Sequence, residues 1–209
     1  MSSKVIIAIV SKRLKEDLKV LILNSAKKLF VEKGIEQTTI RNIADAIGCS
    51  IGTVYVYFKD KNAIFHALHT QGFIQLSSEF KVLLNVSNPM ERLRAMGKVY
   101  INFALKNRDM YDLMFNLKAP MEFLNDEKLH EWNEGKATFD VLRSTVNECL
   151  AAGYFKGHEL EPTAFMVWSM VHGMCSLEIS NRSVGVNIQN PETIVTAAYE
   201  EFMKVMDKL

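Results

Sequence analysis

The chain has 209 residues, of which 48% are hydrophobic and 23% charged, and a net charge of +1; this composition is typical of an ordinary globular protein. The three cysteines, Cys49, Cys149 and Cys175, form no CxxC pair, and their odd number excludes a complete disulfide framework, which favours a reducing cytoplasm. The apolar segment at residues 5–10 is too short for a membrane span or a usual signal peptide, so no membrane association is expected.

The first predicted helix covers residues 14–33, where apolar side chains recur at three- and four-residue steps and Gly34 provides a stop. The apolar residues 5–10 before it either pack onto the body of the protein, extend this helix or contact a partner. A second, shorter helix is predicted from a cap at Thr38 or Thr39 to Gly48, with Ile43 and Ala44 on its inner face.

Residues 51–58, IGTVYVYF, favour a strand by propensity, because they are β-branched and aromatic almost throughout. No neighbouring segment offers a second strand, whereas a helix satisfies the backbone locally and can be capped by Ser50. In the helical interpretation Val54 and Phe58 lie on one face, and Thr53, Tyr55 and Tyr57 point elsewhere. We therefore predict a short helix after a tight turn, which is a helix-turn-helix pattern.

Further helices are predicted over residues 61–84, 90–107, 108–117, 126–153, 162–179 and 191–208, with Asp60, Pro89, Pro162 and Pro191 near their starts. Residues 181–190 are polar and predicted to be a loop. The fold class is therefore all-α, with about nine helices. We expect a helix-turn-helix domain at 14–61 and a second helical domain at 62–209.

Charge is divided unevenly along the chain. Residues 1–61 carry eleven Lys and Arg against six Asp and Glu, a net charge of +5, and the remaining residues carry a net charge of −4. A basic N-terminal part suggests a polyanion as the partner at this end of the chain.

Residues 22–68, ILNSAKKLFVEKGIEQTTIRNIADAIGCSIGTVYVYFKDKNAIFHAL, resemble the DNA-binding domain of the TetR/AcrR transcriptional regulators. The C-terminal part resembles the family branch with a Trp…His-Gly signature, here Trp168, His172 and Gly173. The resemblance implies a homodimeric, ligand-responsive repressor in the cytoplasm that binds a palindromic operator in double-stranded DNA. It assigns ligand binding and dimerisation to the domain at 62–209. The alternative is a DNA-binding regulator without an effector.

The resemblance implies that residues 51–58 enter the major groove and that the second helix holds flanking phosphates. It assigns DNA binding to Thr39, Arg41, Ser50, Gly52, Thr53, Tyr55, Tyr57 and Lys61. Ile51 is interpreted either as an apolar contact to a thymine methyl group or as core.

The effector cavity implied by the resemblance is expected among inward-facing residues of the C-terminal part, which is rich in Met and Phe. Its candidate wall, for an apolar or amphipathic ligand, consists of Tyr100, Phe103, Met114, Phe139, Trp168 and His172. Trp168 and His172 share a face that belongs either to this wall or to the subunit interface. The dimer interface is predicted on the last helix at Ile194, Ala197, Ala198, Phe202 and Val205, and on the helix before it.

The sequence offers no nucleophile–base pair, acidic dyad or cofactor loop at a useful spacing, so we expect neither an enzyme nor a cofactor. His66 and His69 have a spacing that could suit a metal, but they have no third ligand nearby in the sequence, and we interpret them as solvated or packed residues.

Overall fold

The computed structural model describes residues 3–117 and 133–209. Every regular element in these two ranges is helical, which confirms the predicted all-α class. The chain divides into an N-terminal unit, residues 1–72 with 109–125, and a C-terminal unit, residues 73–108 with 126–209. The division falls within one helix, and the expected boundary at residue 61, which follows the helix-turn-helix motif, stays a prediction.

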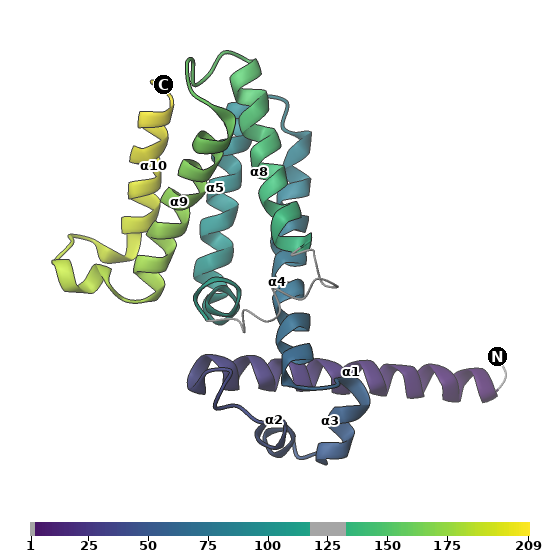
Figure 1. Ribbon diagram of the computed structural model, residues 1–209. Helices are drawn as coiled ribbons and strands as arrows, with labels where there is room; N and C mark the ends of the chain where they lie inside the picture. The colour runs from purple at the N-terminus through teal and green to yellow at the C-terminus, as the bar shows by residue number, and fades with distance from the viewer. Residues whose placement is uncertain (1–2, 118–132) are drawn as a thin grey trace. The chain divides into compact units, whose positions relative to one another are not determined.

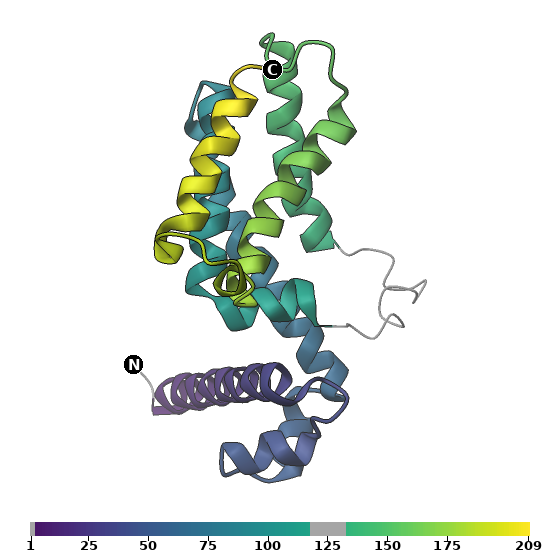
Figure 2. The same cartoon turned by 90° about the vertical axis from the view of Figure 1, so that its left-hand side faces the viewer.

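The N-terminal unit contains a long first helix and a pair of short ones (Figures 1 and 2). Its elements are α1 (Ser3–Lys33), α2 (Ile40–Ala46), α3 (Ile51–Tyr57), the first half of α4 (Lys61–Val82), the end of α6 (Arg108–Tyr111) and a π-helical turn (Asp112–Asn116). Because α1 begins at Ser3, the apolar residues 5–10 extend the first helix. The helical interpretation of residues 51–58 is confirmed over Ile51–Tyr57.

The core of the N-terminal unit is apolar and comes from all four of its main helices. The fully or almost fully buried side chains that these four helices contribute include Ile22, Ala26, Phe30, Ile43, Ala44, Val54, Ile64, Phe65 and Leu68. Phe30 and Phe65 pack edge to face, with ring centroids 6.1 Å apart. This packing explains why two seven-residue helices, too short to be stable alone, hold their shape.

The C-terminal unit is a bundle in which α5, α8, α9 and α10 lie side by side (Figures 1 and 2). These helices span Pro89–Lys106, Asn133–Ala151, Leu160–Ile179 and Ile194–Met206. A short 3₁₀ turn at Leu83–Asn85 leads from α4 towards α5, and two more, Ser183–Val186 and Pro191–Thr193, lie between α9 and α10. The predicted loop at 181–190 thus contains one such turn, and the last α-helix begins at Ile194, because Pro191 opens a 3₁₀ turn instead.

A local capping signal marks the start of α5 in the sequence. The Asn88 side chain accepts hydrogen bonds from the backbone N–H groups of Met90 and Glu91, and Pro89 occupies the first turn, as predicted. By contrast, α9 begins two residues before Pro162. The predicted start of the helix at residue 126 lies outside the described residues.

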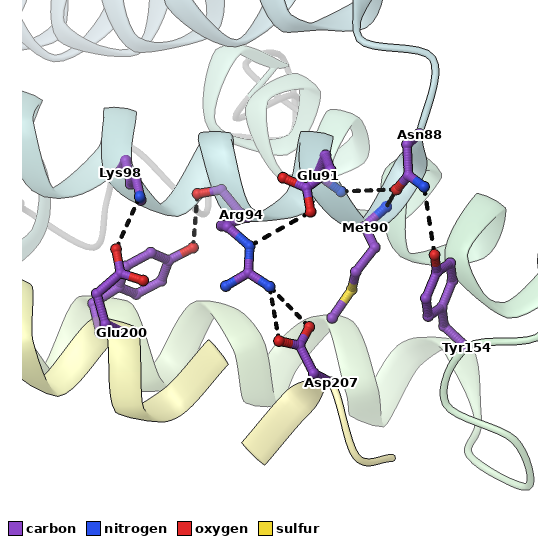
Figure 3. Close-up of polar contacts among 9 residues, drawn as sticks. Asn88, Met90, Glu91, Arg94, Lys98, Tyr154, Glu200 and Asp207 are labelled. Carbon is purple, nitrogen blue, oxygen red and sulfur yellow. Dashed lines mark hydrogen bonds and ion pairs between the residues drawn. The ribbon is translucent and has the colours of Figure 1, made fainter. Parts of the chain in front are cut away.

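Polar contacts attach α10 to α5 (Figure 3). The Arg94 guanidinium donates to both carboxylate oxygens of Asp207, at 2.8 and 2.9 Å, and Lys98 pairs with Glu200 at 2.8 Å. Between them the Tyr199 hydroxyl donates to the Arg94 carbonyl at 2.9 Å. Burial raises the pKa of Tyr199 above its ordinary value, so this hydroxyl stays protonated.

Gly97 lies on α5 directly beneath the Tyr199 ring. A Cβ atom added to Gly97 would lie 2.5 Å from Tyr199 Cε2 and closer still to Cζ and Oη. Only a residue without a side chain allows this approach of α10 to α5.

Candidate functional site

The loop between α1 and α2 is fixed by Thr38, which is fully buried. Its hydroxyl donates to the carbonyls of Gly34 at 2.8 Å and Leu29 at 3.2 Å, and Gly34 itself has the left-handed φ of +81° that ends α1. The neighbouring Thr39 caps α2 instead. Its Oγ1 accepts from Asn42 N at 3.1 Å, and Asn42 Oδ1 accepts from Thr39 N at 3.0 Å.

The turn between α2 and α3 uses a second cap. Gly48 has a φ of +67°, and Ser50 Oγ accepts from Thr53 N at 3.0 Å. The hydroxyls of Ser50 and Thr53 are also hydrogen-bonded to each other at 2.8 Å. The Ser50 cap was predicted, and of the two candidates for the cap of α2, Thr38 and Thr39, the cap is Thr39. The two caps fix the ends of the helices on which the motif is built.

The two faces of α3 differ in burial. Val54 is completely buried and Phe58, just after the helix, is 6% exposed, so this side packs on the core. Tyr55 is 55% exposed on the outside. The predicted contact residues Gly52 and Tyr55 are exposed, and Thr53 and Tyr57 are half-buried. Ile51, which was interpreted either as a DNA contact or as a core residue, is half-buried as well.

Val56 is an outward-facing residue of α3 that was not among the predicted contacts. It is 76% exposed, the highest value among the exposed large hydrophobic residues of the described chain. The sequence could have indicated this exposure, because in a helix a residue two positions from the buried Val54 must point to the opposite side.

Lys61, at the start of α4, has partners within its own unit. Its ammonium group donates to the carbonyls of Ile35 at 2.8 Å and Glu36 at 3.1 Å and so ties α4 to the α1–α2 loop. The start of α4 is capped by Asp60, whose Oδ1 accepts from Ala63 N at 2.8 Å, as predicted. The phosphate contact predicted for Lys61 stays a prediction, and its ammonium keeps one further N–H beyond these two bonds.

Basic side chains lie around α2 and α3. Arg41 on α2 and Lys59 after α3 are exposed. Lys19 of α1 places its ammonium 5.7 Å from the centroid of the Phe58 ring, so α1 also contacts the C-terminal end of the α3 segment. The outer side of this motif thus combines hydroxyl, apolar and cationic groups on a rigid, capped support.

Four of the six predicted effector-binding residues lie together in the C-terminal unit. The Tyr100 hydroxyl lies 3.0 Å from His172 Nδ1, and the Trp168 ring centroid lies 5.9 Å from that of His172 and 5.7 Å from that of Phe139. Burial lowers the pKa of His172, which favours the neutral imidazole. We call these four residues the aromatic cluster.

The other two predicted wall residues are placed differently. Phe103 is 1% exposed, within the core of the C-terminal unit. Met114 belongs to the N-terminal unit, where its side chain lies against Gly72. Phe165 was not among the predicted wall residues. It is 60% exposed, and its ring centroid lies 6.0 Å from that of Trp168. The i, i+3 spacing of Phe165 and Trp168 was the available signal.

The outer side of α9 exposes four large apolar side chains, and α10 adds a fifth beside the exposed ion pair of Glu201 and Lys204. These apolar residues are Phe165, Met166, Met170, Leu177 and Val205, and we call them the outer row. Of the predicted interface residues on α10, Ala197 and Val205 are exposed, and Ile194 and Ala198 are half-buried. Phe202 is only 9% exposed, because it shares the inner side of α10 with Tyr199, 6.4 Å away between ring centroids.

The described residues contain no group of three or more His, Cys, Asp and Glu side chains that could hold a metal ion. His66 is exposed, and the His69 ring lies 5.9 Å from that of Phe65. Likewise, no helix in the described ranges is long and apolar enough to cross a membrane.

Comparisons with known proteins agree with this architecture. Residues 22–68 match the family described as bacterial regulatory proteins, tetR family, and residues 93–202 match the tetracyclin repressor-like C-terminal domain. An HTH-type transcriptional repressor of Mycobacterium tuberculosis is 43% identical over 47 residues, 22% of this chain and 25% of the relative. The Transposon Tn10 TetC protein of Escherichia coli is 27% identical over 127 residues, 60% of each chain. These matches span less than two thirds of either relative.

The fold is also found in solved structures. The regulator FadR of Bacillus subtilis, determined in complex with stearoyl-CoA, superimposes with a TM-score of 0.72 at 16% identity, over 90% of this chain and 97% of FadR. At this identity the likeness shows the fold alone. The two family matches cover more than half of the chain, which therefore belongs to the TetR family of bacterial DNA-binding transcriptional regulators.

Proposed function

We propose that this protein is a cytoplasmic repressor that binds a palindromic DNA operator as a homodimer and releases it when an apolar or amphipathic effector binds. The observation that carries the proposal is α3. It is a short helix with a buried inner side at Val54 and an outward side on which Gly52, Tyr55 and Val56 are exposed. A capped helix of this kind fits the major groove of B-DNA.

Phosphate contacts would position α3 in the groove. Arg41 and Thr39 lie at the start of α2, and Tyr55 presents its hydroxyl from the outer side of α3. The Thr39 hydroxyl already caps α2. Thr39 would therefore assist phosphate binding indirectly, by holding the N-terminal end of α2, whose free N–H groups would face a phosphate. Arg41 would supply the charge.

Dimerisation would use the outer row. A monomer that exposes several large apolar side chains on two adjacent helices has a surface suited to a second copy, and twofold symmetry would pair α9 and α10 of one chain with those of the other. Two α3 helices would then read two half-sites about one helical turn apart.

The aromatic cluster supports the effector part of the proposal. A neutral His172 and the Tyr100 hydroxyl supply a few polar groups among Phe139 and Trp168, a combination suited to an amphipathic ligand. The alternative, a regulator with no effector, predicts that native mass spectrometry of the purified protein finds no bound small molecule.

Binding to duplexes selected from a random library tests the DNA part. Tyr55→Phe removes one hydroxyl per half-site and should weaken binding by about 10- to 150-fold for each half-site, because a hydrogen bond to a charged group contributes about 1.5–3 kcal/mol. Arg41→Ala should weaken all sequences alike and reduce the salt slope by about one per half-site. The control is Lys136→Ala, which removes an exposed charge from α8.

The control variant should bind like the unmodified protein. The proposed DNA surface is wrong if both Tyr55→Phe and Arg41→Ala also leave affinity and salt dependence unchanged.

A further inference from the structure

We propose that Val56 contacts the C5-methyl group of a thymine and so determines the base preference at the centre of each half-site. This inference rests on the proposed DNA binding and names the base that the outermost side chain of α3 recognises.

The position of Val56 follows from helix geometry. At 3.6 residues per turn, Val56 lies about 200° around α3 from Val54, which is completely buried. Gly52, four residues earlier, lies on the same outward line and is also exposed. Val56 and Gly52 therefore form the line of α3 that would enter deepest into a groove.

The chemistry of this line excludes hydrogen bonding by side chains. Gly52 has no side chain, and Val56 ends in two methyl groups without a donor or acceptor. Among the bases, thymine alone presents a methyl group in the major groove, and apolar side chains contact it. Valine in a helix has one strongly preferred rotamer, so its methyl groups are presented in a fixed direction.

The neighbouring residues of α3 are less suited than Val56 to an apolar contact with a base. The Thr53 hydroxyl is hydrogen-bonded to Ser50 Oγ at 2.8 Å, which helps to hold the turn. Ile51, the earlier candidate for a thymine contact, is half-buried towards the core side of the helix. Val56 is 76% exposed, so packing against the described residues does not explain an apolar side chain there.

The test replaces thymines by uracil, one at a time, in a half-site selected by the full-length protein from random duplex DNA. Uracil removes only the methyl group. We expect one thymine per half-site at which the change weakens binding about fourfold, the value for one buried carbon. In Val56→Ala the same change should cost less than twofold. Val184→Ala, which shortens an exposed valine of the other unit, is the matched control and should retain the fourfold cost.

Three outcomes separate the claims. A uracil-sensitive thymine that becomes insensitive only in Val56→Ala supports the inference. Equal uracil costs in Val56→Ala and the unmodified protein, or no sensitive thymine in a bound half-site, overturns the inference while DNA binding stands. If no duplex is enriched or bound, the proposed function itself is wrong.

Discussion

The contact between Gly97 and Tyr199 gives a prediction whose sign depends on two opposing terms. Gly97→Ala in a helix interior should by itself stabilise the protein by about 0.5–1 kcal/mol through a lower backbone entropy of the unfolded chain. The new Cβ would, however, lie 2.5 Å from Tyr199 Cε2 and closer to two further ring-tip atoms. Tyr199 is 1% exposed, so its ring has little room to move away.

Overpacking of a core costs about 1–3 kcal/mol. Displacing the ring also breaks the 2.9 Å hydrogen bond to the Arg94 carbonyl and leaves a buried hydroxyl without its acceptor, at a cost of about 1–3 kcal/mol. Against a gain of at most about 1 kcal/mol, we expect a net destabilisation of about 3 kcal/mol.

Urea unfolding followed by circular dichroism measures this change, at one protein concentration because the midpoint of a dimer depends on it. Ala137→Gly, at an exposed position of α8, calibrates the backbone term and should destabilise by about 1 kcal/mol. In a Tyr199→Leu background, which removes the ring tip, Gly97→Ala should become stabilising. An unfolding midpoint for Gly97→Ala at or above that of the unmodified protein would refute the reasoning.

Three other predictions concern the motif, the assembly and the switch. Lys61→Met removes the ammonium that donates to two carbonyls and should lower the free energy of unfolding by about 1–3 kcal/mol. Lys59→Met, at an exposed position, should leave it unchanged, and equal stabilities of the two variants would contradict the structural role of Lys61. Leu177→Glu places a charge in the outer row and should convert a dimer to a monomer in sedimentation, with helical content unchanged; a monomeric unmodified protein would contradict the interface. A co-purifying effector should bind operator-bound protein roughly 5- to 150-fold more weakly than free protein in calorimetry, and equal affinities would exclude regulation.

The sequence predicted the elements well where the signal is local. The caps at Thr39, Ser50 and Asn88 are side chains that bond backbone groups two or three residues away, so they can be recognised without knowledge of the fold. For the same reason the motif helices were placed to within one or two residues. The start of α9 shows the limit, because Pro162 is tolerated anywhere in the first turn.

Contacts between distant residues could not be predicted. Lys61 meets carbonyl groups 25 and 26 residues earlier, Tyr100 meets a histidine 72 residues later, and Tyr199 meets a carbonyl 105 residues earlier. Helical periodicity indicates which face is buried but not which residue of another helix it meets. For Lys61 this matters most, because a side chain that was predicted to contact DNA proves to tie α4 to the α1–α2 loop of its own unit.

The separation of the two faces of α3 has a consequence for how such a regulator can diverge. Val54 and Phe58 carry the folding constraint, whereas Gly52 and Val56 are exposed and carry almost none. Substitutions at position 56 are therefore accessible to evolution and to directed selection with little loss of stability. If Val56 reads a base as proposed, a duplicated copy could change its DNA preference at this position while keeping its core unchanged.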